Sequence, residues 1–225
     1  MRIKIIILSM IFLTTIGLFT SYGLAQTKTI HSSLTLPLAT GITVSVSRVD
    51  PLGTSDPSDD MWSPDWMGEL NFGPLQTVSG VIGGKKWVAL LGKYYYALDI
   101  GLSDGVADYT KTVNVKGTNF IHPTGSNGLK KKGVITAVVE YYINFPDQED
   151  AKIIGKETFD DGISISFADT VITGGGKTYA GWPRFYIGLA TKDPEAIVPD
   201  PLDAEVFTPA DPAGDYACDI VVTYF

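Results

Sequence analysis

The sequence predicts an all-β protein, and three observations support that class. Short segments with alternating apolar and polar residues recur along the 225 residues, as in half-buried β-strands. Clusters rich in Gly, Asn and Asp separate them and supply the positive φ angles of tight turns. These clusters lie at 103–105, 124–128, 160–162 and 174–176. No long helical pattern alternates with the strands, so we expect an antiparallel β-sandwich rather than a parallel α/β sheet.

The first 25 residues have the composition of a secretory signal peptide. Arg2 and Lys4 precede a mostly apolar stretch, and Gly23 and Ala25 stand where a small-residue cleavage site requires them. We therefore expect an exported protein, in the periplasm, on the cell surface or outside the cell, with one β-sandwich domain over residues 26–225. The apolar stretch is short for a membrane-spanning helix, so we do not expect an integral membrane protein.

The formal net charge is −8 at pH 7. Residues 1–25 carry two basic and no acidic side chains, so their removal would change the net charge to −10. An acidic surface disfavours nucleic acid and anionic lipid as partners.

The strands are predicted in chain order from the alternation. The first covers 34–46, where alternate residues are apolar and Gly41 interrupts the run, and a polar stretch, 26–33, precedes it. An acidic loop rich in Asp, Pro and Trp follows at 49–69. A helical turn is considered only at 147–156. The other strands are expected at 70–72, 87–91, 94–102, 112–116, 135–145, 163–167, 185–189 and 206–208.

The last strand, 216–224, has the clearest pattern. Tyr216, Cys218, Ile220 and Val222 share one side-chain direction, and we expect that face to be buried. Cys218 is the only cysteine, so no intramolecular disulfide can form. On an apolar face it acts as a small hydrophobe. The alternative role for Cys218 is a crosslink between two subunits.

No motif predicts a catalytic, cofactor-binding or metal site. His31 and His122 have no Cys or His at ligand spacing. Residues 174–177, Gly-Gly-Gly-Lys, lack the spacing of a phosphate-binding loop and indicate a hairpin turn instead. Acidic residues that could offer oxygen ligands to Ca²⁺ lack the spacing of an EF-hand loop, so a solvated acidic loop is preferred. These are Asp56, Asp59, Asp60 and Asp65. We expect no enzymatic activity and no cofactor.

The tryptophans suggest a second kind of site. Exposed indole rings stack on sugars, although aromatic side chains more often fill the interior of a sandwich. Trp62 and Trp66, in the polar loop, are better candidates for exposure than Trp87 and Trp182. The basic run at 130–132 is interpreted as a solvated turn.

Three segments in order resemble a known group of secreted bacterial domains. They are Leu-Asn-Phe-Gly-Pro-Leu at 70–75, Phe-Tyr-Ile-Gly-Leu-Ala-Thr at 185–191, and Pro-Ala-Gly-Asp-Tyr at 212–216 before an apolar strand. They resemble the pilin-like sandwiches typified by the spore coat U family and its relatives among domains of unknown function. The resemblance implies an immunoglobulin-like fold, a role in surface structures and no catalytic residue. Spore coat U domains usually carry disulfide-forming cysteines, so the cysteine-free relatives are the closer match.

Two functions from different classes follow. The first is a non-enzymatic secreted or cell-surface structural protein, such as a fimbria-like or filament subunit whose partners are other protein subunits. The second is a secreted carbohydrate-binding or adhesive module whose partners are glycans. Segment 34–46 bears on the first, because a strand near one end of a domain can pair within its own sheet or extend a neighbour's. Pairing in its own sheet is preferred, because the effective concentration is higher.

Overall fold

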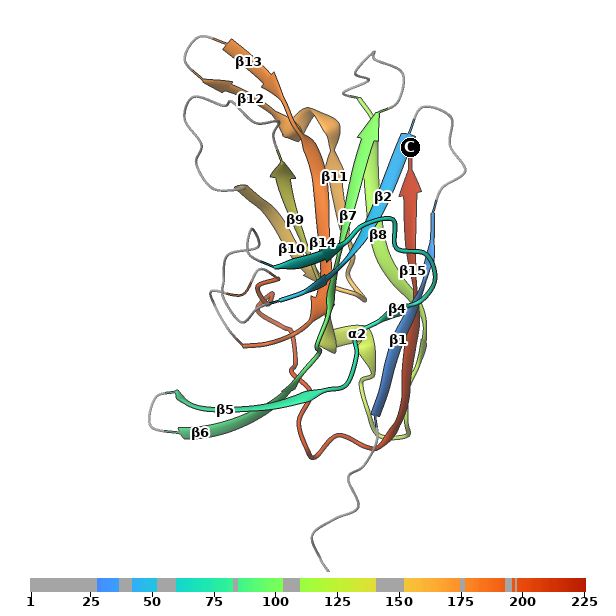
Figure 1. The fold of residues 1–225 in the computed structure, drawn as a ribbon, viewed down its shortest axis with the longest axis vertical. Helices are drawn as coiled ribbons and strands as arrows, with labels where there is room; N and C mark the ends of the chain where they lie inside the picture. The colour runs from blue at the N-terminus through green and yellow to red at the C-terminus, as the bar shows by residue number, and fades with distance from the viewer. Residues whose placement is uncertain are drawn as a thin grey trace, which may run out of the picture.

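Two β-sheets face each other in the structure, which is a computed structural model (Figure 1). The all-β sandwich class expected from the alternation is confirmed. The structure describes residues 28–36, 42–51, 60–82, 85–102, 110–140, 152–174, 177–192, 196 and 198–225. The proposed signal peptide therefore lies outside the described residues.

The first sheet has five strands in the spatial order β11-β8-β15-β1-β4. Its neighbours are antiparallel except for β1 and β15, which run parallel. Because we expected antiparallel strands throughout, this pair is a departure from the prediction. The strands are β11 (Ile163–Ser166), β8 (Thr112–Ile121), β15 (Gly214–Tyr224), β1 (Lys28–Thr35) and β4 (Leu70–Asn71).

The second sheet has six strands in the order β10-β9-β14-β7-β2-β3. They are β10 (Lys152–Thr158), β9 (Gly133–Glu140), β14 (Trp182–Leu189), β7 (Tyr95–Leu102), β2 (Ile42–Asp50) and β3 (Met61–Ser63). Two hairpins extend from the sandwich, and two short helices complete the described elements. These are β5 (Gln76–Ile82) with β6 (Lys85–Leu91), β12 (Val171–Gly174) with β13 (Lys177–Ala180), α2 (Leu129–Lys132) and the 3₁₀ helix η1 (Phe167–Thr170).

The central strands of the six-stranded sheet, β9, β14 and β7, are buried on both faces. On β7, Tyr96 and Leu98 point into the core between the sheets, whereas Tyr95 and Ala97 belong to a second cluster on the outer face. Successive side chains of a strand point to opposite faces, so this double burial explains why β7 is apolar at nearly every position. The outer cluster includes Ala89 of the β5–β6 hairpin, with Val198 and Val206 of the segment before β15.

The burial predicted for the last strand is confirmed. Tyr216, Cys218, Ile220 and Val222 of β15 are all at most 3% exposed. The Cys218 sulfur lies 3.2 Å from the Ser32 hydroxyl oxygen on β1. Burial raises the pKa of the Cys218 thiol to about 12, which suits a packed thiol rather than a reactive one.

The prediction of one strand over 34–46 is wrong. Its two halves belong to β1 and β2, which lie in different sheets, and residues 37–41 between them lie outside the described residues. β1 also begins earlier, inside the stretch interpreted as polar, because Ile30 is 2% exposed in the core. An isolated apolar residue among Lys, Thr, His and Ser gave too weak an alternation to extend the prediction.

Two further local predictions are corrected. The part of the 147–156 helical turn that is described, from Lys152, lies in β10, which pairs with β9. The basic run is not simply a solvated turn, because Lys132 is 4% exposed. Its ammonium group lies 3.0 Å from the Asp211 carboxylate and donates to the Val206 carbonyl at 2.9 Å. A buried lysine needs such partners, and they come from a segment more than 70 residues away in sequence.

Candidate functional site

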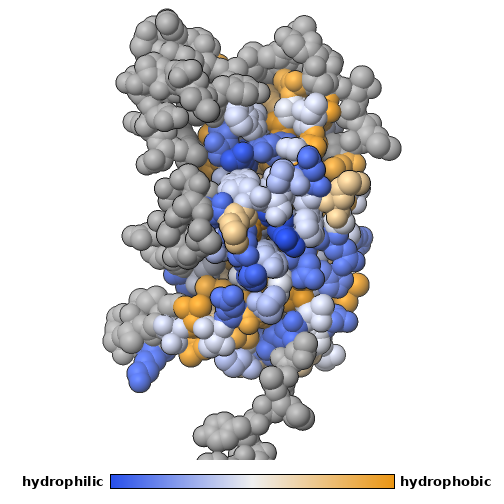
Figure 2. All heavy atoms as spheres, viewed as in Figure 1, coloured by the Kyte–Doolittle hydropathy of each residue, from blue (hydrophilic) through white to orange (hydrophobic). Residues whose placement is uncertain are grey.

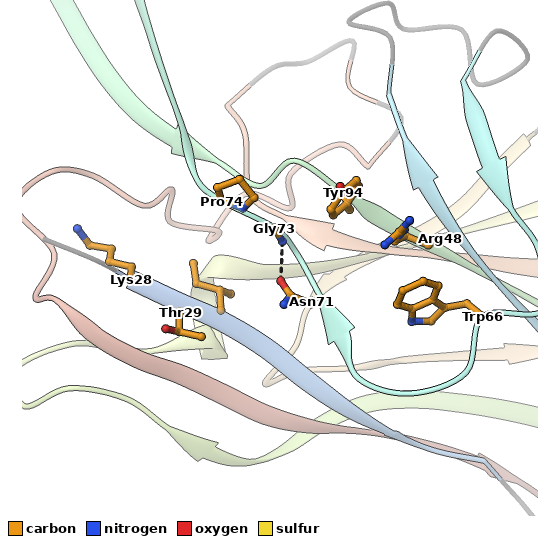
Figure 3. A pocket seen from close by; sticks show the side chains of 9 residues that line it. Lys28, Thr29, Arg48, Trp66, Asn71, Gly73, Pro74 and Tyr94 are labelled. Carbon is orange, nitrogen blue, oxygen red and sulfur yellow. Dashed lines mark hydrogen bonds between the residues drawn. The ribbon is translucent and has the colours of Figure 1, made fainter. Parts of the chain in front are cut away.

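A pocket opens beside β1, at the edge of the five-stranded sheet (Figure 3). Its volume is about 490 Å³, within the usual range for sites that bind small molecules. Lys28 and Thr29 of β1 form one wall, and Arg48, Trp66 and Tyr94 lie on the opposite side. The remaining lining is formed by Ile30 and by the turn after β4. Among the described residues that line this pocket, none has an acidic side chain.

A tight turn after β4 shapes the wall between these two sides. The Asn71 side-chain oxygen accepts a hydrogen bond from the Gly73 backbone N–H at 2.8 Å, an Asx turn. Gly73 has φ of 73°, and a Cβ there would lie 2.9 Å from the Lys93 Cβ. Both facts favour glycine at this position. The turn leaves the NH₂ group of Asn71 on the pocket side, away from Gly73 (Figure 3).

Arg48 lies between two aromatic rings. Its guanidinium carbon is 4.3 Å from the ring centre of Trp66 and 4.6 Å from that of Tyr94. Trp66 is held in turn by its indole N–H, which donates to the Glu69 carbonyl at 3.1 Å, and by contact with Tyr96 at 6.1 Å between ring centres. Within the described residues, packing against the two rings rather than an ion pair therefore fixes the orientation of the planar guanidinium.

Two acidic side chains near this region are paired with other groups. Asp50 lies 3.1 Å from the Lys93 ammonium, and the hydrogen bonds that Lys93 donates to Tyr94 and Asp50 raise its pKa. Glu69 lies 3.5 Å from the His31 ring. Arg48 thus has no carboxylate partner within the part of the chain that the structure describes.

A second arginine lies in a polar cluster on the outer face of the six-stranded sheet. Arg184 of β14 binds Asp99 of β7 through two nitrogens, at 2.6 and 3.0 Å, and Glu140 of β9 at 2.9 Å. The Trp182 indole also donates to Asp99, at 3.0 Å. Burial raises the pKa of Glu140, although the Arg184 charge opposes that shift. The cluster joins three adjacent strands, so its geometry is that of a structural ion-pair network.

The structure describes two of the four residues considered for calcium, Asp60 and Asp65. Asp60 is 8% exposed and accepts a hydrogen bond from the Tyr95 hydroxyl at 2.5 Å. Asp65 is exposed, while Asp56 and Asp59 lie outside the described residues. Within the described ranges, no group of three or more His, Cys, Asp or Glu side chains is placed to hold a metal ion.

The two histidines have different surroundings, and so do the two candidate tryptophans, Trp62 and Trp66. His31 lies on β1 beside Glu69, and His122 is exposed in the loop after β8. Trp62 packs against the outer cluster with Arg184 5.0 Å from its ring centre, whereas Trp66 packs against the core between the sheets. Both rings are half-buried, and they lie on different faces of the sheet. They do not form one exposed platform.

Sequence reasoning missed Arg48, although a signal was present. A period of two places Arg48 on the same face of β2 as Val44 and Val46, and a cation in line with core residues needs a partner or a function. The sequence contains no comparable signal for Tyr94 and Asn71. These residues line the same pocket as Arg48 because β4 packs against the start of β7.

No family model, curated protein or solved structure matches this chain. Within the described residues, none of the helices has the length and apolar character needed to cross a membrane.

Proposed function

We propose that the protein is a non-enzymatic, exported structural subunit of a cell-surface assembly, with an immunoglobulin-like, pilin-like fold. The observation that carries the proposal is the placement of β1. This strand completes one sheet beside β15, while the chain continues into β2 of the opposite sheet. The signal-like composition of residues 1–25 supports export.

More residues of β1 are paired through their backbone than are buried through their side chains. All eight of its residues have partners on β15, from Lys28 opposite Gly214 to Thr35 opposite Val221. Only His31 and Ser32 have partners on β4, and only Ile30 and Ser32 of β1 are buried. Since backbone hydrogen bonds do not depend on which chain supplies them, β1 of a second copy can occupy the same place.

The start of β15 supports the immunoglobulin-like part of the proposal. The Tyr216 hydroxyl donates to the Pro212 carbonyl, four residues upstream, at 2.7 Å. Its ring packs edge-on against Phe207 at 4.9 Å between centres. A buried tyrosine bonded back to the chain in this way resembles the tyrosine corner of immunoglobulin-like sandwiches. The same residues carry the Pro-Ala-Gly-Asp-Tyr resemblance.

Removal of β1 tests the proposal. A protein lacking residues 26–36 is expected to bind a synthetic peptide of residues 27–36, because the peptide restores the ladder on β15. The intact protein is expected to form multimers at high concentration that persist in SDS. Peptide binding is measured by fluorescence anisotropy and multimers by gel electrophoresis without boiling. The control peptide carries Ile30→Asp, which places a charge in the core and is expected not to bind.

Two outcomes would contradict assembly by strand exchange. In the first, the truncated protein is folded but does not distinguish the two peptides. In the second, the truncated protein is unfolded, the peptide does not rescue it, and the intact protein stays monomeric. Either result would make β1 an ordinary strand of its own domain.

A second candidate function, a carbohydrate-binding or adhesive module, is favoured by one observation. Trp66 lines an open pocket with polar neighbours. Trp62 does not support it, because its ring packs against the outer cluster beside Arg184. Loss of glycan binding in Trp66→Ala but not in Trp62→Ala, with both variants folded, is the result expected of such a module.

A further inference from the structure

The pocket beside β1 contains a cation, Arg48, that has no carboxylate partner among the described residues. Other basic side chains form ion pairs with carboxylates, among them Lys93, Lys131, Lys132 and Arg184. Arg48 forms none with the described residues, although the protein is strongly acidic. A guanidinium has five N–H donors, and half-buried donors gain free energy when an acceptor reaches them.

The rings beside Arg48 determine where such an acceptor can lie. The guanidinium carbon lies over the Trp66 and Tyr94 rings, and the N–H donors point outward in the plane of the guanidinium group. A planar carboxylate matches this edge, because two parallel N–H···O bonds can form. The arrangement leaves Arg48 preorganised for a carboxylate ligand in the pocket.

The rest of the lining favours a ligand with hydroxyl groups. The Lys28 ammonium and the Asn71 NH₂ group are further donors at the pocket, and the Tyr94 hydroxyl, which accepts from Lys93 at 3.1 Å, can donate its own proton. Aromatic and proline surfaces at Trp66, Tyr94 and Pro74 provide apolar contact. Hydroxyls for the donors, an apolar C–H face for the rings and a carboxylate for Arg48 coexist in an acidic sugar.

An acidic peptide fits less well. Extended peptides bind mainly by adding a strand to a sheet edge. The edge strand here, β4, has two residues, and the Gly73–Pro74 turn ends it. This ladder is too short to hold a peptide strand.

We propose that this pocket binds an acidic saccharide of the uronic acid type, with the carboxylate paired to Arg48. The proposal does not require that the protein assembles into filaments. Because Lys28 and Thr29 belong to β1, the pocket is complete only while β1 lies beside β15.

Calorimetric titration of the full chain tests the proposal. The probes are a tetrasaccharide of glucuronic acid and the matching neutral tetrasaccharide of glucose. The acidic probe is expected to bind at least about tenfold more tightly, because a charge-assisted bidentate pair is lost with the neutral one. Arg48→Gln is expected to remove that preference, and Arg48→Lys to keep part of it, since a lysine retains charge without the planar fork.

Lys111→Gln is the matched control. The Lys111 ammonium also lies over a ring, 5.6 Å from the centre of Tyr224, and its removal changes the net charge equally. Affinity for the acidic probe should change by less than about twofold in this variant, because salt screens charges outside the site. If Arg48→Gln does not fold, as judged by circular dichroism, Lys28→Gln serves in its place and is expected to weaken binding of the acidic probe.

Three results would overturn the proposal. One is equal affinity of the unmodified protein for the acidic and neutral probes, or binding of neither. Another is equal loss of affinity in the Lys111 and pocket variants, which indicates a general charge effect. The third is equally tight binding of a tetraglutamate peptide, which indicates an acidic protein partner. Since all titrations use monomeric protein, their failure leaves the strand-exchange experiment unaffected.

Discussion

Arg48 and Arg184 both contact aromatic rings, yet they differ in their acidic partners. Arg184 binds two carboxylates on neighbouring strands, whereas Arg48 is held by two rings and binds none among the described residues. The first arrangement satisfies its charges internally and links three strands. The second fixes a cation at the wall of an open pocket. The difference separates an arginine that stabilises the fold from one that is available to a ligand.

Neutralising Arg184 is expected to have the largest effect on stability. Arg184→Met keeps much of the side-chain length but leaves Asp99 and Glu140 without their cation. Their side chains are only 24% and 21% exposed, so we expect a loss of about 3 kcal/mol in the free energy of unfolding. Urea denaturation measures it. A loss below about 1 kcal/mol would show that the network contributes little beyond a surface ion pair.

The same change at Arg48 is expected to cost less. Arg48→Met removes two cation–π contacts but leaves no carboxylate of the described residues unpaired, so we expect a loss of about 1 kcal/mol. The two variants are compared in one urea denaturation series. Equal losses would mean that Arg48 is as important to the fold as Arg184, and the proposed division of roles would be wrong.

The pH dependence of the Arg184 network should be the smallest of these effects. Burial raises the pKa of Glu140 above its ordinary value of 4.5, so folding favours its protonated form. The stability gained from that protonation is full below pH 4.5 and is lost as the pH rises through the higher folded-state pKa. Glu140→Gln removes this titration.

Denaturation of both proteins from pH 3 to pH 7 checks the sign. The stability of Glu140→Gln relative to the unmodified protein is expected to rise with pH across this interval. A relative stability that is constant or falls with pH would show that Arg184 dominates over burial at Glu140.

The sequence was most informative where burial follows a local period. Tyr216, Cys218, Ile220 and Val222 could be placed in the core because β15 has one buried face and a clear turn before it. Ile30 could not, because polar residues surround it and its partners lie on β15. An alternation with a period of two residues does not show which sheet a strand joins. The sequence therefore did not reveal that β1 and β2 belong to different sheets.

The candidate site was still less accessible to sequence reasoning. The two-residue alternation of β2 could have identified Arg48 as a residue on the core-facing side. The pocket is also lined by Trp66 from a loop and by Asn71 from the short strand β4. These residues meet through tertiary packing. For the same reason the buried pairing of Lys132 with Asp211 was invisible in a run of three lysines.

The parallel pairing of β1 with β15 has a consequence for how the chain folds. Opposed residues in this pair, such as Ser32 and Cys218, are 186 positions apart, so β15 leaves the ribosome long after β1. Closing so long a loop is entropically costly and slow. Until it closes, the two-residue ladder on β4 is the only pairing left to β1 among the described strands, and β1 exposes unpaired backbone groups. During that interval the nascent strand and the unfilled edge of β15 are both available to other chains.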